Sequence, residues 1–293
     1  MLDFAITQQR PILIYDSNYP SIAKIALHAR DRGYDIHILA PGFPESATFN
    51  LLDLVKDSTD SVAAHDLATI IYQLSQSNVD SFFTYSSIQL IQAVLMLAKE
   101  FTLADLLTAS AILECDRLTE RLMAAPLNPW LKLAFGQLLS TVGTKTNTEI
   151  ITTAFAILGN FIATQSASNC FLGAASFPLK IKDKQLVILG FNAESQAILA
   201  SLMSSIMPTI ITYDAVKPLV FTTDELFFAK EIKHLTIPII KNSPHFNEFN
   251  HESWNNFTSD IVQPKTDYSI IQKQSNIRKL EIEQSLPIPQ LIG

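Results

Sequence analysis

Segments with β-strand character occur in two groups separated by a long helical stretch, and this spacing constrains the fold more than any other feature. They are residues 11–15 and 35–40 before the gap, and 185–189 and 219–223 after it. Between the first two, residues 21–32 carry apolar side chains at helical spacing, and Gly33 follows as a helix end. Such a strand–helix–strand unit forms a right-handed parallel crossover. We therefore predict an α/β fold with a parallel sheet.

The stretch between the two groups carries repeated helix-start signals. They are Asp57-Ser-Thr-Asp60, Thr102-x-x-Asp105, Asn128-Pro129 and Thr146-x-x-Glu149. We predict an all-helical insertion over residues 59–171, within an α/β core formed by residues 1–58 and 172–240. A further helix is expected over 194–207. Residues 241–293 are rich in Asn, Ser, Gln and Pro, and we expect them to form a loosely ordered tail.

Composition narrows the possible partners. Hydrophobic residues make up 48% of the chain and charged residues 17%, a balance that favours folding over disorder. The net charge is −7, and the 59–171 segment holds five Lys/Arg against nine Asp/Glu, so direct DNA binding is not evident. The most apolar window, 150–163, is shorter than a membrane span, and no signal peptide is apparent. We expect a soluble, cytoplasmic chain without a transmembrane segment.

Acidic residues follow two of the predicted strands. The 219–223 strand leads into Asp224 and Glu225, the Walker B arrangement in which the Asp faces Mg²⁺ and the Glu orients water. Asp16 ends the first strand in the same way. Ligand sites of open α/β sheets lie at the carboxyl ends of strands. The same acids also fit chance occurrence and ordinary helix N-caps, and for Asp16 composition favours the cap.

A phosphate-binding loop is not present in these 293 residues. That loop needs Gly, four residues, and then Gly-Lys-Ser/Thr, so that backbone N–H groups wrap the phosphates. The nearest imitation, Gly143-Thr-Lys145-Thr146, lacks a glycine directly before Lys145 and follows a predicted helix. The sequence contains neither the Gly-x-Gly-x-x-Gly pattern of dinucleotide-binding folds nor the Gly-x-Ser-x-Gly elbow of hydrolases.

The order of these segments resembles the TraG/TraD-like coupling ATPases of type IV secretion and conjugation. The resemblance rests on Pro11-Ile-Leu-Ile-Tyr-Asp16, Ile36-His-Ile-Leu-Ala-Pro41 and Asn50-Leu-Leu-Asp53, followed by helices and then the strand before Asp224-Glu225. It covers roughly residues 10–235. It implies a P-loop NTPase-like (RecA-like) core with an all-helical insertion. It further implies Mg²⁺ and ATP as cofactors, with Asp224 as the Mg²⁺ ligand, Glu225 as the catalytic acid and Asp16 near the nucleotide.

Members of that family are hexameric motors, anchored at the cytoplasmic face of the inner membrane, that pass relaxase-bound DNA to the secretion channel. This sequence departs from the family pattern in several places. Asn18 stands where the turn usually has Lys, and Leu51 replaces the Pro of Asn-Pro-Leu-Asp. The Walker A segment and the anchor should precede the Ile12 strand. We therefore expect a truncated member with an incomplete core and without ATPase activity of its own.

Two other interpretations remain open. The chain could be a binding module whose helical insertion engages a relaxase or an intact coupling ATPase. It could also be a decaying gene fragment without a selected function. An upstream reading frame that encodes a Walker A segment would instead favour a split ATPase.

Overall fold

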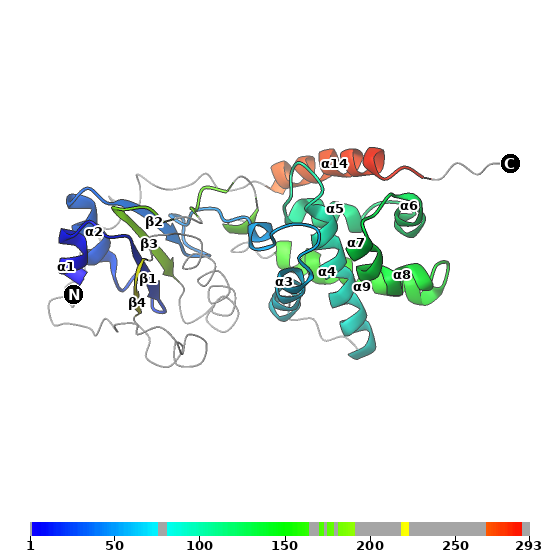
Figure 1. Ribbon diagram of the computed structural model, residues 1–293, viewed down its shortest axis with the longest axis horizontal. Coiled ribbons are helices and arrows are strands. Elements are labelled where there is room, and N and C mark those ends of the chain that lie inside the picture. Colours follow the sequence, from blue (N-terminus) through cyan, green and yellow to red (C-terminus); the bar gives the residue numbers. More distant parts are fainter. Residues whose placement is uncertain are drawn as a thin grey trace. The chain divides into compact units, whose positions relative to one another are not determined.

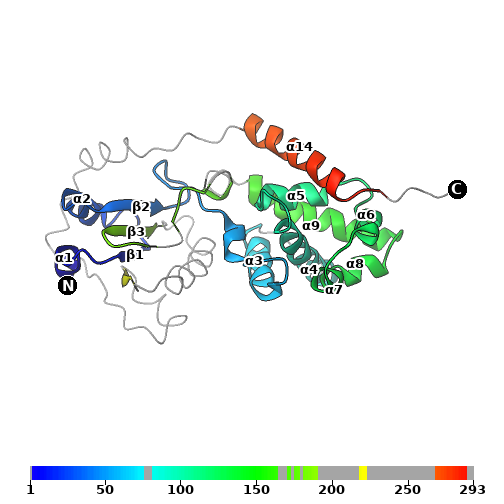
Figure 2. The same ribbon diagram turned by 45° about the horizontal axis from the view of Figure 1, so that its top comes forward.

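The computed structural model describes residues 2–75, 81–163, 170–172, 175–178, 181–190, 218–222 and 268–288. The chain divides into two compact units (Figures 1 and 2). The α/β unit consists of residues 1–49 and 174–265, and the helical unit of residues 50–173 and 266–293. The helical unit thus begins at Asn50, nine residues before the predicted start, and it includes the C-terminal residues.

Four strands form one parallel sheet, as the sequence predicts. They are β1 (Ile12–Asp16), β2 (Asp35–Leu39), β3 (Gln185–Gly190) and β4 (Leu219–Thr222), in the order β2-β3-β1-β4. Ile12 of β1 is in register with Leu186 of β3 on one side and with Leu219 of β4 on the other. The carboxyl ends of all four strands therefore meet at one edge. The helix predicted over 194–207 lies outside the described residues.

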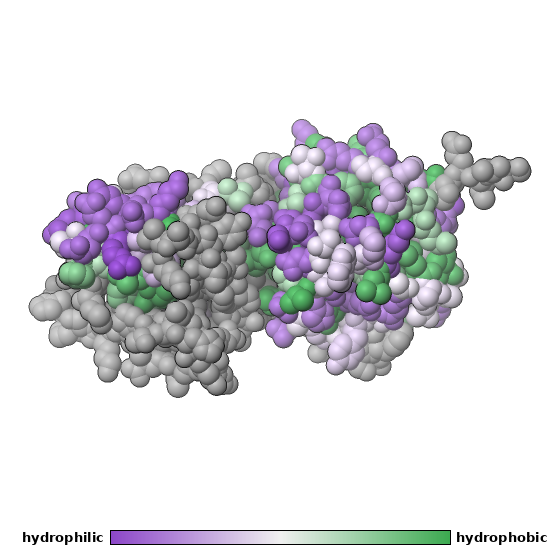
Figure 3. All heavy atoms as spheres, in the orientation of Figure 1, coloured by the Kyte–Doolittle hydropathy of each residue, from purple (hydrophilic) through white to green (hydrophobic). Residues whose placement is uncertain are grey.

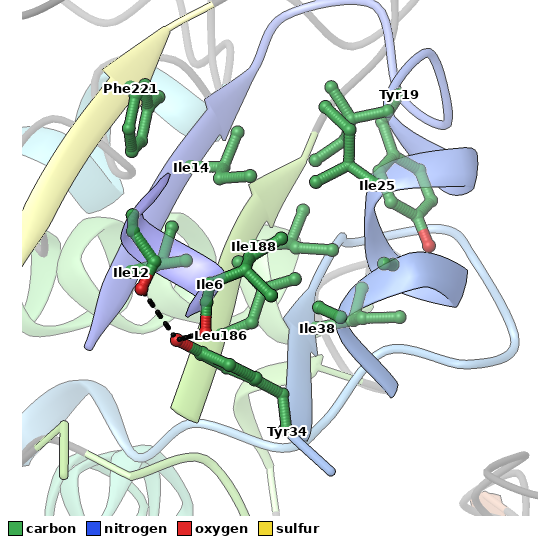
Figure 4. Packing of buried hydrophobic residues seen from close by; sticks show 14 of the residues in the cluster. Ile6, Ile12, Ile14, Tyr19, Ile25, Tyr34, Ile38, Leu186, Ile188 and Phe221 are labelled. Atoms are coloured by element: carbon green, nitrogen blue, oxygen red, sulfur yellow. Dashed lines mark hydrogen bonds between the residues drawn. The ribbon is translucent and has the colours of Figure 1, made fainter. Parts of the chain in front are cut away.

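Two helices cover one face of this sheet, α1 (Leu2–Thr7) and α2 (Ala23–Asp31). Alternate strand residues such as Ile12, Ile14 and Ile188 point into the same buried cluster (Figure 4). The hydroxyl of Tyr34 donates to the carbonyls of Ala5 at 3.1 Å and Arg10 at 2.9 Å, which ties α1 to the start of β2. Continuous apolar runs in β1 and β3, which are buried on both faces, and an amphipathic α2 therefore explain this layer.

The helical unit contains a short 3₁₀ turn, η1 (Leu51–Leu54), and eight described α-helices. They are α3 (Ser61–Leu74), α4 (Ser81–Ala98), α5 (Leu106–Leu113), α6 (Leu118–Ala124), α7 (Pro129–Ala134), α8 (Gly136–Ser140), α9 (Lys145–Ala163) and α14 (Tyr268–Ser285). Helix α5 packs against α4, α9 and α14, and all eight of its residues are buried. Helix α5 is mostly apolar and is therefore stable only when neighbouring helices cover it on every side. The described residues between 59 and 171 include helices and no strand.

The predicted helix starts are partly correct. Asp60 and Asn128 accept hydrogen bonds from the backbone N–H groups of Ala63 and Leu131, as N-caps do. The other two helix-start signals, Thr102-x-x-Asp105 and Thr146-x-x-Glu149, have the pattern of a capping box, in which the Thr is the N-cap, and both of these N-cap assignments are wrong. Asp105 is itself the N-cap of α5 and accepts from the N–H of Thr108. Helix α9 begins at Lys145, and the hydroxyl of Thr144 accepts from the N–H of Asn147. For α5 and α9, the sequence pattern therefore placed the N-cap two or three positions away from the residue that caps the helix in the structure.

The expectation of a loosely ordered tail over 241–293 needs correction, because α14 lies within it. Helix α14 packs on α5, and its buried residues Arg278 and Ile282 lie four positions apart on one face, with buried Leu286 following directly after the helix. The outward side of α14 carries hydrophilic residues with scattered hydrophobic ones (Figure 3). Among the described residues, no helix combines the length and the apolar composition that crossing a membrane requires.

Candidate functional site at the carboxyl edge of the sheet

The carboxyl edge of the sheet brings together the ends of β1 and β3. Asp16 is the last residue of β1 and lies in register with Gly190, the last residue of β3. Strand β4 ends beside them at Thr222, next to Tyr15. Asp224 and Glu225, the predicted Walker B acids, lie outside the described residues. The structure confirms that the strand before them is parallel to β1 and adjacent to it, at an edge position among the described strands.

The carboxylate of Asp16 is fully buried and organises the turn that leads into α2. Its Oδ1 accepts from the N–H of Asn18 at 3.2 Å and from the hydroxyl of Ser21 at 2.7 Å, and its Oδ2 accepts from the N–H of Ile22 at 3.2 Å. A negative charge before a helix start also complements the helix dipole. Both oxygens thus bind groups of the turn that precedes α2. The N-cap of α2 is Ile22, without a side-chain cap, so Asp16 is a turn residue and not the helix N-cap that composition favours.

A second buried acid lies near this turn. Glu45 is 5% exposed, and its Oε1 accepts a hydrogen bond of 2.8 Å from the hydroxyl of Tyr19. The ring of Tyr19 meets that of Phe43 edge to face, with centroids 4.7 Å apart. Burial raises the pKa of Tyr19 far above its usual range, and the charges of Glu45 and Asp16 raise it further. The phenol therefore remains a neutral hydrogen-bond donor to Glu45.

Gly190 allows the Tyr19 ring to lie directly over the end of β3. A Cβ atom on Gly190 would meet Cδ2 of Tyr19 at 2.5 Å and its Cβ at 2.9 Å. Such distances do not occur between real side chains, so any larger residue would displace the ring. The residue at this strand end must therefore be glycine for the turn to keep its packing.

These contacts define what the described part of the edge can do. It holds two buried carboxylates, Asp16 at the end of β1 and Glu45 in the segment that follows β2. Within the described residues there is no group of three or more His, Cys, Asp or Glu side chains that could hold a metal ion. A complete Mg²⁺ or nucleotide site at this edge would therefore depend on further residues, and by sequence Asp224 and Glu225 follow β4 closely enough to contribute.

The sequence that imitates a phosphate-binding loop has a different role. Gly143 adopts a left-handed φ of 74° in the turn between α8 and α9. Lys145 is the first residue of α9, and its Nζ lies 3.4 Å from Glu149 Oε1 at the exposed helix surface. This turn belongs to the helical unit and follows a helix, so it lacks the strand-to-helix setting of a phosphate loop.

The Asn50-Leu-Leu-Asp53 segment is structural in the helical unit. The side chain of Asn50 accepts from the N–H of Leu52 and donates to the carbonyl of Ala104 at 2.8 Å. Lys99 Nζ donates to the carbonyl of Leu52 at 3.0 Å. Burial raises the pKa of Asp53, while Lys99 and the Asn50 amide oppose that rise. These contacts fasten the entry of the chain to α4 and α5.

Sequence reasoning identified Asp16 but missed Tyr19, Glu45 and Gly190. A glycine at the end of an apolar strand was the available signal for Gly190, since such positions often mark a close approach of other atoms. Tyr19 and Glu45 are 26 positions apart, and the intervening sequence carries no periodic pattern that would pair them.

No family model matches this sequence, and no curated protein matches it. The solved structures that resemble the chain distantly include two structures of coupling proteins. One is described as the bacterial conjugative coupling protein TrwBdeltaN70 in complex with sulphate, with a TM-score of 0.39 and 8% identity over 72% of this chain and 55% of that one. The other is the plasmid coupling protein TrwB in complex with the non-hydrolysable ATP analogue ADPNP, with a TM-score of 0.40 and 10% identity over 75% and 58%. This chain therefore spans little more than half of theirs. A similarity of this degree is too distant to transfer an activity.

Proposed function

We propose that this chain is a coupling-protein-like component of type IV secretion or conjugative DNA transfer that does not hydrolyse ATP by itself. One observation carries the proposal. The helical unit enters the chain between β2 and β3 of a parallel sheet, and the strand that leads to Asp224-Glu225 lies beside β1, which ends at Asp16. This is the order of elements that the sequence resemblance to the TraG/TraD-like family implies.

The proposed core is an incomplete P-loop NTPase-like sheet. In such enzymes the backbone of the phosphate-binding loop and its Lys supply most of the hold on the nucleotide. The 293 residues contain no such loop, and Lys145 is paired with Glu149 in the other unit. Asp224 would then hold Mg²⁺ only weakly, because an acid without a positive partner repels the polyphosphate that the metal must bridge.

Equilibrium binding of MgATP and a phosphate-release assay on the full chain test this proposal. We expect no turnover and binding no tighter than millimolar. Asp224→Asn and Glu225→Gln should change neither result, and Asp35→Asn, an exposed acid at the opposite end of the sheet, is the matched control. Micromolar binding with turnover that is lost in Glu225→Gln would contradict the proposal. Turnover that appears only when a Walker A fragment is added would indicate a split enzyme.

A binding role of the helical unit is the second candidate, and apolar side chains exposed on its surface favour it. This unit is compact in its own right and carries exposed apolar side chains, among them Trp130 and Leu133 on α7. The proposed partners are a relaxase or an intact coupling ATPase. Co-purification of the full chain with each should be reduced by Trp130→Ala combined with Leu133→Ala, while Val62→Ala on α3 should leave it unchanged. Equal recovery of all three forms would reject this binding surface.

A further inference from the structure

The helical unit is completed by a helix that returns from elsewhere in the sequence. Residues 50–173 form most of this unit, the chain then continues through β3 and β4 of the α/β unit, and α14 finally packs on α5. Residues 223–267 separate β4 from α14 in sequence. A terminal element that fills a gap in a unit formed earlier in the chain is the kind of element that two copies of a protein can exchange.

The contact between α14 and its site is specific and self-contained. The guanidinium of Arg278 donates to Asp105 through Nε at 3.2 Å and Nη2 at 2.5 Å, and both side chains are buried. Arg121 donates through Nη1 to the carbonyls of Glu283 at 3.0 Å and Leu286 at 2.5 Å, where α14 ends. Ile282 and Leu286 follow Arg278 at intervals of four residues, and both are buried. The ion pair, the hydrogen bonds at the end of α14 and its buried apolar residues together make this binding site specific for the sequence of α14.

We propose that α14 exchanges between two copies of this chain, so that the helical unit of each copy is completed by the α14 of the other. The partner is a second copy because α14 is the sequence whose side chains fit Asp105 and Arg121. When α14 leaves its site, Arg278 and Asp105 both become hydrated. When it docks on the second copy, Arg278 pairs with the Asp105 of that copy, so no buried charge is left unpaired. This proposal is independent of the proposed function.

A charge reversal in two separate chains tests the exchange. Asp105→Arg and Arg278→Asp each bring like charges together at the buried site, so neither variant alone can dock its own α14. In an equal mixture each helix meets an opposite charge on the other chain. We expect each variant alone to have the 32.5 kDa mass of one chain, and the mixture to reach twice that mass in light scattering. The double variant in a single chain is the control for folding, since it restores attraction both within one copy and between two copies.

Cys115 provides a second measurement. It is 5% exposed, and burial raises the pKa of its thiol. Of the charges on α14, that of Glu283 raises this pKa further and that of Lys279 lowers it. Its alkylation, measured with Cys170→Ser in every chain, should be at least tenfold faster in each single variant than in the mixture or the double variant. A mixture that keeps the mass of one chain and stays reactive, beside a protected double variant, would overturn the proposal.

Asp105 also caps α5, so a test without substitutions is needed in case its variant does not fold. Unlabelled and ¹⁵N-labelled natural chains are mixed, partly unfolded in urea, refolded together and treated with an amine–carboxyl cross-linker. Cross-links between α14 and residues 105–121 that join a labelled to an unlabelled chain are the expected result. Cross-links of this kind that occur only within one isotope type would overturn the exchange.

Discussion

Arg278 of α14 and Asp105 at the start of α5 form a buried ion pair, with Nη2 and Oδ2 2.5 Å apart and 8% and 10% of the two side chains exposed. The same carboxylate caps α5 by accepting from the N–H of Thr108. One side chain thus fixes both where α5 begins and where α14 docks.

Arg278→Met should destabilise the helical unit by about 3 kcal/mol, because it leaves the Asp105 carboxylate buried without its cation. Lys273→Met, on the exposed side of the same helix, should change stability by less than about 0.5 kcal/mol. Urea unfolding followed by circular dichroism measures both. Equal stability of the two variants would show that the ion pair contributes nothing.

Cys115 should resist alkylation in the natural chain at pH 8 in its folded state. Burial first, and then the charge of Glu283, raise the pKa of its thiol to about 11, so the reactive thiolate is scarce. In a Cys170→Ser background, labelling should rise steeply only as pH approaches 11 or as the unit unfolds. Rapid labelling at pH 8 without loss of helical signal would contradict the structure around α14.

Gly190→Ala should destabilise the α/β unit by about 1–3 kcal/mol, since the added Cβ would overlap the Tyr19 ring. Gly159→Ala, in the middle of α9 with nothing within 4 Å of the new atom, should instead stabilise its unit by up to about 1 kcal/mol. Thermal unfolding of the two variants beside the natural chain distinguishes these effects. A neutral Gly190→Ala would mean that the ring is not held against the strand end.

Tyr19 should make the chain less stable at high pH. Its pKa is raised in the folded state, so below the ordinary value of 10.0 the phenol is neutral in both states and no stability is lost. Above that value the unfolded chain releases the proton while the folded chain keeps it, and stability falls as pH rises. Tyr19→Phe should therefore show a shallower decline above pH 10 in urea unfolding. Tyr85→Phe, at a tyrosine that is 76% exposed, should keep the natural slope.

Thr144→Ala should cost about 1 kcal/mol, because its hydroxyl accepts from the N–H of Asn147 in the first turn of α9. Thr146→Ala, the cap expected from sequence, lies inside the helix and should be close to neutral. Comparison of their unfolding midpoints in urea decides between the two residues. A larger effect at Thr146 would restore the capping box that the structure removes.

The strands were predictable because short apolar runs rich in β-branched residues and bounded by turn residues strongly favour β-structure. All four strands occur within one or two residues of their expected bounds. Helix α14 was missed because its buried face includes Arg278, which reads as a surface residue until Asp105 is placed beside it. Tyr19 and Glu45 were missed for the same reason, because they form a buried hydrogen bond with each other although they are 26 positions apart. Local pattern identifies which segments are regular, whereas partners distant in sequence decide which polar residues are buried.

The strand order has a consequence for synthesis. Strands β1 and β2 are made first, yet β3 lies between them in the sheet, and both neighbours of β1 follow the whole of residues 50–173. A growing chain on the ribosome therefore carries two apolar strands that have no edge to pair with until β3 emerges. During this interval we expect chaperones that bind unfolded segments to associate with the nascent chain. The sheet can form only after β3 has emerged and paired with both β1 and β2.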